Sequence, residues 1–155
     1  ESVYINSYTK VLIKCNIHKR AFKQSPTNHY SQSGCRLCAR ISKGERAIIK
    51  YLETNNINYE SEKSFKGCRR EGSKTYLKFD FYIPSLNLLI EYDGIQHYEK
   101  ILKKYKGFDS EFNIIKSRDE FKNQWAKSSG YKLIRIPYYD FVDINNILDL
   151  LFKDI

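Results

Sequence analysis

The sequence predicts a mixed α/β domain, and two observations lead to that fold class. Residues 76–83 and 87–93 are short runs of aromatic, aliphatic and β-branched residues separated by a proline–serine pair, which is typical of a β-hairpin. Apolar residues recur at helical spacing in residues 43–55 and 144–151, which predicts helices that pack on a sheet. We therefore expect a sheet flanked by helices.

Composition predicts one core domain with a small module in front of it. The 155 residues include 41% hydrophobic residues, 13 Tyr and 9 Phe, enough for one core, and we expect a module at 1–42 and a domain at 43–155. No apolar run approaches the roughly 20 residues that span a membrane. Without a secretory leader, we expect an intracellular protein. Because the sequence opens at Glu1 and contains no Met, we expect a piece of a longer or processed protein, with a missing domain or a homodimer as open alternatives.

The charge balance predicts a polyanionic partner. There are 27 Lys and Arg against 18 Asp and Glu, a net charge of +9. Excess cations bind phosphate backbones without reading sequence, so nucleic acid is the expected partner. A membrane surface is not expected, because no basic amphipathic helix concentrates the charge.

A CxxH…CxxC pattern predicts a structural zinc site in the module. Each pair encloses two residues and sixteen residues separate the pairs, about one hairpin. The expected ligands are Cys15, His18, Cys35 and Cys38. His29 is the alternative nitrogen ligand, and disulfide pairing that includes Cys68 is the alternative chemistry. We otherwise expect Cys68 to be a free thiol without a role in a polar loop.

Acidic residues along the hairpin predict a cation site. With the turn centred between residues 84 and 87, Asp80 and Glu91 fall opposite each other on one face. Asp93 shares that face at the strand period of two, and Gly94 lets the chain bring His97 back over the strand end. Facing carboxylates repel, so a hard divalent cation such as Mg²⁺ is expected between them, with an imidazole near enough to take a proton from water. The alternative is a set of solvated acids on an ordinary hairpin.

Two helices are expected to bring further charged groups to the same site. Glu45 precedes the apolar stripe of the helix at 43–55 by three, four and seven residues and so projects from its buried face. A helix from Asp109 or Ser110 to about Ser128 carries the charged residues Arg118, Asp119 and Lys122. By spacing alone, Glu45 is explained equally well as a first-turn acid favoured by the helix dipole. An ion pair on the surface between residues 119 and 122 explains those two charges better than a shared site does.

The remaining segments are expected to be structural or to contact the partner. Residues 59–65 and 131–136 read as strands, the second buried and closed by Pro137. Residues 66–74 form a basic loop directly before the hairpin.

The hairpin resembles the PD-(D/E)xK nuclease superfamily, and within it the very short patch repair (Vsr) endonucleases and the EDxHD homing endonucleases. The motifs are Phe-Asp-Phe-Tyr-Ile-Pro at 79–84 and Ile-Glu-Tyr-Asp-Gly-Ile-Gln-His at 90–97, and the resemblance covers about residues 44–140. Residues 1–42 resemble the zinc ribbons of phage nucleases. Where the common pattern has lysine, this chain has Asp93, which leaves the lysine's duty with His97 or Lys122 and leaves open whether Glu91 or Asp93 completes the metal shell.

The resemblance implies a restriction-endonuclease-like mixed sheet and a Mg²⁺-dependent DNA endonuclease of homing, phage or mobile-element type. It implies that Asp80 and Glu91 hold Mg²⁺, that Asp119 orients His97 as general base, and that Glu45 holds a water or the second ring nitrogen. Expected contacts to duplex DNA come from Lys23, Arg36, Arg69, Arg70 and Arg118. The alternatives are a non-cleaving DNA-binding protein on a nuclease fold, a structure-selective nickase and an RNA nuclease.

Overall fold

The protein is described here by a computed structural model. The described residues are 3–15, 20–31, 34–35, 38–98 and 108–153, without the side chains of 108–111. The chain divides into two compact units, Glu1–Ser42 and Lys43–Ile155.

The second unit is built on a four-stranded mixed sheet. Its strands, in spatial order, are β3 (Glu60–Ser64), β4 (Lys78–Ile83), β5 (Leu88–Asp93) and β6 (Lys132–Pro137). Strand β4 is antiparallel to both of its neighbours, β3 and β5, whereas β5 and β6 are parallel. The expectation of a mixed α/β unit with a sheet flanked by helices is confirmed.

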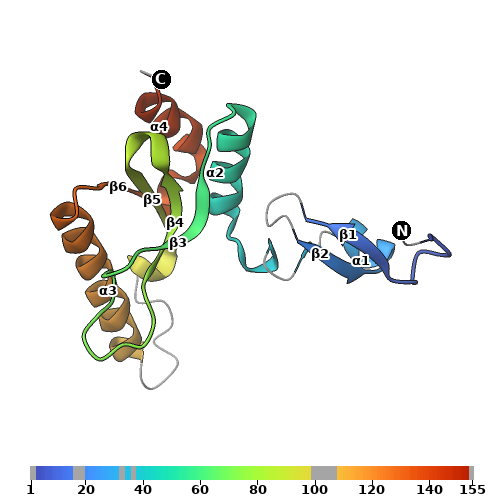
Figure 1. The fold of residues 1–155 in the computed structure, drawn as a ribbon, viewed down its shortest axis with the longest axis horizontal. Coiled ribbons are helices and arrows are strands. Elements are labelled where there is room, and N and C mark those ends of the chain that lie inside the picture. Colours follow the sequence, from blue (N-terminus) through green and yellow to red (C-terminus); the bar gives the residue numbers. More distant parts are fainter. Residues whose placement is uncertain (1–2, 16–19, 32–33, 36–37, 99–107, 154–155) are drawn as a thin grey trace. The chain divides into compact units, whose positions relative to one another are not determined.

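Helices cover both faces of this sheet (Figure 1). They are α2 (Lys43–Thr54), α3 (Phe108–Ser128) and α4 (Ile144–Leu151), each within two residues of its expected range. Helix α3 connects β5 to β6 across one face, the kind of connection that parallel strands require, while α2 and α4 lie on the other face. In the described part of the chain, no helix has the length and apolar character needed to cross a membrane.

The hairpin of β4 and β5 has the register that a turn centred on residues 84–87 predicts. Pro84 opens a short 3-10 helix, and Asn87 leaves it in the left-handed region at φ 51°. Phe81 then pairs with Ile90, and Ile83 with Leu88. This register places Asp80 next to the last paired residue of β4, at the level of the end of β5.

Cys68 lies in the expected loop, but its side chain belongs to the core, so the expectation that it has no role is wrong. Its side chain is fully buried and packs with Phe79, Leu89 and Ala126. The amide of Leu77 donates to the carbonyl of Cys68 over 2.7 Å, which fixes the basic loop against the hairpin. A thiol behaves as a small hydrophobe, so a cysteine can anchor a loop that is otherwise polar.

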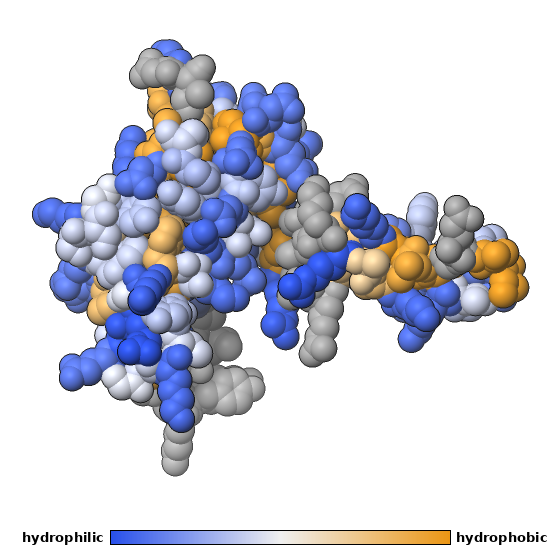
Figure 2. Space-filling model, viewed as in Figure 1, coloured by the Kyte–Doolittle hydropathy of each residue, from blue (hydrophilic) through white to orange (hydrophobic). Residues whose placement is uncertain are grey.

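The first unit has little apolar core. It contains β1 (Val11–Lys14), β2 (Ala21–Gln24) and the short helix α1 (Pro26–Tyr30), which the sequence did not predict. Among its described residues, those classed as buried are Cys15, Ser25 and Cys35. Apolar side chains such as Val3, Ile5 and Leu12 are more than half exposed, and Figure 2 shows apolar side chains on the surface of this unit. So small a unit needs a staple beyond hydrophobic burial.

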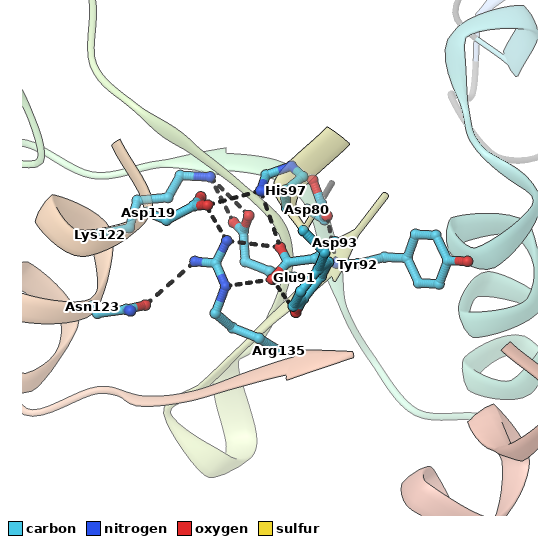
Figure 3. Close-up of polar contacts among 10 residues, drawn as sticks. Asp80, Glu91, Tyr92, Asp93, His97, Asp119, Lys122, Asn123 and Arg135 are labelled. Carbon is cyan, nitrogen blue, oxygen red and sulfur yellow. Dashed lines mark hydrogen bonds and ion pairs between the residues drawn. The ribbon is translucent and has the colours of Figure 1, made fainter. Parts of the chain in front are cut away.

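Gly44 allows α2 to lie close to β5. A Cβ at this position would overlap the ring of Tyr92, whose side chain points from β5 towards α2 (Figure 3). The missing side chain therefore sets the position of the first turn of α2, and with it the position of Glu45.

We expect Gly44→Ala to lower the free energy of unfolding by about 1–3 kcal/mol, because the added methyl group displaces the Tyr92 ring. Urea denaturation followed by circular dichroism measures the change. Lys50→Ala, at an exposed position of the same helix, is the control and should change stability by no more than about 0.5 kcal/mol. In a Tyr92→Ala background the Gly44→Ala cost should shrink; an unchanged cost would show that the ring is not what the methyl group meets.

Candidate active site

Asp80 lies where β4 and β5 stop pairing with each other. The last ladder pair in this direction is Phe81 with Ile90. Beyond it, the Oδ2 atom of Asp80 accepts the amide hydrogen of Tyr92 over 2.8 Å, as a strand carbonyl otherwise would. Burial, together with the negative charge of Glu91, raises the pKa of Asp80 to about 7. The Asp80 carboxyl is therefore held in place but unfavourably charged.

Glu91 is buried and is paired with a lysine from α3. Its side chain is 5% exposed, and the Nζ atom of Lys122 lies 2.8 Å from each of its carboxylate oxygens. The same ammonium group lies 5.1 Å from the ring centre of Phe79. Burial raises the pKa of Glu91, and the charge of Lys122 opposes that rise.

A second acid of β5, Asp93, is held by Arg135 of β6. The Nε and Nη2 atoms of Arg135 each donate to one oxygen of Asp93 over 2.7 Å. Nη2 also donates to Oδ1 of Asp119 over 2.7 Å, and Nη1 donates to Asn123 over 3.3 Å. The other oxygen of Asp119, Oδ2, lies 2.8 Å from Nδ1 of His97 (Figure 3). The guanidinium group of Arg135 therefore connects β6 to β5 and to α3, and through Asp119 it also connects to His97.

The charges of this network fix which ring nitrogen of His97 carries a proton. Burial opposes the ionisation of Asp119, but the hydrogen bond from His97 and the charge of Arg135 outweigh it and hold the pKa of Asp119 below its usual value. An ionised carboxylate only accepts hydrogen bonds, so the Nδ1 atom of His97 donates to it. In the neutral ring, Nε2 then keeps its lone pair.

The predicted site residues meet at one open cleft of about 420 Å³. Its lining includes Glu45, Asp80, Glu91, His97, Arg118, Asp119 and Lys122. These side chains come from α2, β4, β5, α3 and the turn after β5. Acids, a histidine and cations therefore surround a single space open to solvent.

Other predicted residues lie apart from the lining of this cleft. Asp93 lines a neighbouring hollow with Arg135, and His97 and Asp119 line both spaces. His97, Asp93 and Asp119 do offer ligand atoms within 4.8 Å of one another, but the guanidinium of Arg135 already bonds to both carboxylates. Arg69 is exposed and lies over the ring of Tyr76, at 5.7 Å from its centre.

The remaining predicted contacts to nucleic acid are only partly described. Arg70 is half-buried in the basic loop. In the first unit, Lys23 is exposed on β2. Arg36 and His18 lie outside the described residues. His29, the alternative nitrogen ligand, is on α1, where its Nδ1 lies 3.3 Å from Oε1 of Gln24.

Three cysteines of the first unit form a cluster that could bind a metal such as zinc. The sulfur atoms of Cys15, Cys35 and Cys38 lie within 4.8 Å of one another, and none of the three forms a disulfide. Burial, together with the neighbouring thiols, raises the pKa of Cys38 to about 12. Thiolates packed this closely are stable only beside a cation, and three sulfurs match the donor set of structural zinc.

Arg135 is the site residue that the sequence reasoning missed. The apolar residues around it, Leu133, Ile134 and Ile136, predict a buried strand with a structural role only. The signal lay in the same pattern, since a charge within an apolar strand must find a partner of opposite sign. The parallel register that places Glu91 beside Arg135 could not be read from local sequence.

Comparison with known proteins finds viral relatives and no matching family model. The chain is 29% identical over 116 residues to "Uncharacterized protein 094L" of Frog virus 3 (isolate Goorha), a match covering 75% of this chain and 66% of that protein. It is 37% identical over 112 residues to "Uncharacterized protein 307L" of Invertebrate iridescent virus 6, covering 63% of this chain and 56% of that protein. The chain thus spans less than two thirds of the length of either relative, and activity has to be argued from the cleft.

The raised pKa of Asp80 predicts that this acid destabilises the folded chain at neutral pH when Mg²⁺ is absent. Because its pKa rises from 3.8 to about 7 on folding, the folded state binds more protons in that window, and the free energy of unfolding falls as pH rises through it. Asp80→Asn keeps an acceptor for the Tyr92 amide and removes the charge. We expect the variant to be more stable than the wild type at pH 8 by up to about 4 kcal/mol, and by less at pH 5.

Urea denaturation of both proteins at the two pH values, without added magnesium, measures this difference. Asp143→Asn, a change at an exposed aspartate, controls for the loss of a negative charge. A stability difference between Asp80→Asn and the wild type that is the same at pH 5 and pH 8 would contradict the raised pKa.

Proposed function

We propose that this chain is a Mg²⁺-dependent DNA endonuclease that hydrolyses phosphodiester bonds. The observation that carries the proposal is the cleft where Asp80 and Glu91, both with raised pKa, meet His97 and the cations Lys122 and Arg118. Phosphodiester hydrolysis needs a cation at the phosphate, a base for water and charge stabilisation around the transition state. The cleft offers a group for each task.

Asp80 and Glu91 fit a Mg²⁺ ion. Both carboxyls are unfavourably charged where they lie, which a divalent cation would reverse. Asp93 fits poorly, because it does not line this cleft and both of its oxygens are held by the planar fork of Arg135. Of the two acids that the sequence left open, we therefore assign Glu91 to the metal shell. When bound, Mg²⁺ would polarise the scissile phosphate and offset charge developing on it.

His97 is the proposed general base. Its Nδ1–H is engaged by Asp119, so Nε2 is the nitrogen that can take a proton from the attacking water. Lys122, which contacts Glu91 from α3, is the residue to which we assign the duty of the lysine that position 93 lacks. Glu45 lines the same cleft, where it can accept a hydrogen bond from that water.

Duplex DNA is the proposed substrate. The chain has a net charge of +9, and Arg118 and Lys122 line the cleft where a phosphate would enter. Arg69 and Arg70 lie on the loop that precedes β4, and Lys23 and Arg36 belong to the first unit. We propose that these residues contact the DNA backbone and that the second unit belongs to the PD-(D/E)xK superfamily.

A non-cleaving DNA-binding role is the second candidate. The observation that favours it is the pairing of Lys122 with both oxygens of Glu91, which already supplies Glu91 with a positive charge. If that pair never opens, Glu91 does not reach a metal, and the fold serves as a binding platform.

A plasmid assay separates the two candidates. Supercoiled DNA incubated with the protein and Mg²⁺ should be nicked or linearised, and EDTA should stop the reaction. Asp80→Asn and His97→Ala should each slow cleavage about 10²–10⁴-fold, because they remove a metal ligand and the base, while DNA binding measured by fluorescence anisotropy persists. Asp143→Asn, at an exposed position, should cut like the wild type. Tight binding by the wild type without any Mg²⁺-dependent cleavage would favour the platform.

We also propose that the first unit is a zinc ribbon held by Cys15, Cys35 and Cys38, with His18 as the fourth ligand from its spacing. The purified protein should contain one zinc ion per chain by atomic emission. Cys35→Ser and His18→Ala should each lower the zinc content, because a closed four-ligand site loses one donor. Cys68→Ser is the matched control and should keep its zinc, since Cys68 is outside the cluster. Full zinc content in Cys35→Ser would refute the assignment.

A further inference from the structure

We propose that Arg135 is a positioning residue that holds His97 in its base-competent form through Asp119. The base role of His97 rests on the proposed function, whereas the contacts among Arg135, Asp119 and His97 do not depend on any reaction. Arg135 lies on β6, where the parallel register sets it beside Glu91. Its side chain belongs to the hydrogen-bond network that includes Asp119 and His97.

Asp119 is bonded at both of its carboxylate oxygens. Oδ1 accepts from Nη2 of Arg135 over 2.7 Å, and Oδ2 lies 2.8 Å from Nδ1 of His97. A carboxylate bonded at one oxygen only can rotate about its side-chain torsions. Bonded at both oxygens, it presents Oδ2 to the ring in one direction. Arg135 therefore fixes the acceptor that fixes the ring.

The guanidinium is itself fixed. Two parallel bonds of 2.7 Å join it to Asp93, whose side chain is 4% exposed, and a further bond of 3.3 Å joins it to Asn123. Such a fork-to-carboxylate pair sets the plane of the guanidinium. The buried Asp93 thus holds Arg135 in place, Arg135 holds Asp119, and Asp119 contacts His97. This order gives a reason for a buried ion pair directly beside the proposed base.

The charges work in the same direction. The Nδ1 atom of His97 lies 2.8 Å from Asp119 and 3.7 Å from Asp93, so two carboxylates face one nitrogen. Without Arg135, these carboxylates would repel each other and Asp119 would turn towards solvent. The ring would then lose the partner that keeps its proton on Nδ1, and Nε2 would carry the proton in part of the molecules.

A direct test must avoid the obvious variant. Arg135→Gln alone leaves Asp93 buried without a counter-charge, which is enough by itself to destabilise the fold. We therefore compare Asp93→Asn with the double variant Asp93→Asn/Arg135→Gln. In both, residue 93 is neutral, and the pair differs only in whether Arg135 is present to hold Asp119. Circular dichroism of both variants checks that they are folded before they are compared.

The first readout is the tautomer of His97, measured by ¹⁵N NMR of the zinc-loaded chain without DNA or Mg²⁺. The chain has three histidines, and the His97 signals are those missing from His97→Gln. Asp93→Asn keeps one side-chain acceptor for Arg135, so we expect the Nδ1–H tautomer in this variant as in the wild type, and a mixture with Nε2–H in the double variant. The same tautomer in both variants would overturn the proposal, whether or not the protein cleaves DNA.

The second readout is cleavage. The double variant should show a kcat about 10–100-fold below that of Asp93→Asn, with KM for DNA unchanged, because a positioning residue acts on the chemical step. Equal kcat in the two variants would show that Arg135 serves only to neutralise Asp93. If the wild type does not cleave, the nuclease proposal fails, and the tautomer still decides the role of Arg135.

Discussion

Two buried carboxylates at the end of β5 set the constraint on which the second unit depends. Glu91 and Asp93 are 5% and 4% exposed, and charges so far from water are tolerated only when paired. Their partners come from elsewhere, Lys122 from α3 and Arg135 from β6. Pairing these acids therefore fixes the rotation of α3 over the sheet and the register of β6 beside β5. The shape of the cleft follows from satisfying these two charges.

The two acids differ in what holds them, and this difference separates their chemistry. An ammonium group is a point charge on a flexible stem, so Lys122 can turn from Glu91 towards a phosphate without breaking a fixed geometry. The guanidinium of Arg135 forms a planar fork with Asp93 and has a third partner in Asp119. Sequence alone could not distinguish Glu91 from Asp93, because both lie on one face of one strand. The cationic partner therefore decides which of the two acids can release its ion pair and bind a metal instead.

The sequence predicted what depends on local patterns. Hairpin register followed from the turn at residues 84–87, and helix boundaries followed from apolar spacing and from Gly130, whose φ of 76° ends α3. The sequence could not reveal the partners of Arg135 or the core position of Cys68, because both depend on which distant segments meet. A parallel neighbour such as β6 lies across a whole helix in sequence, and no local rule fixes its register. A residue such as Arg135, which joins a site from a parallel strand, therefore cannot be assigned to that site from local sequence.

Asp80 shows how the proposed activity conflicts with stability. Its carboxylate takes the place of a strand acceptor for the Tyr92 amide, a task that an asparagine would perform without a charge. Instead the chain keeps an acid whose pKa is raised to about 7 by burial and by Glu91. A fold selected for stability alone gains nothing from that choice, whereas a site that must attract a divalent cation requires uncompensated negative charge before the cation arrives. The unfavourable placement of Asp80 is therefore an argument for a ligand of positive charge in this cleft, independent of any resemblance to known nucleases.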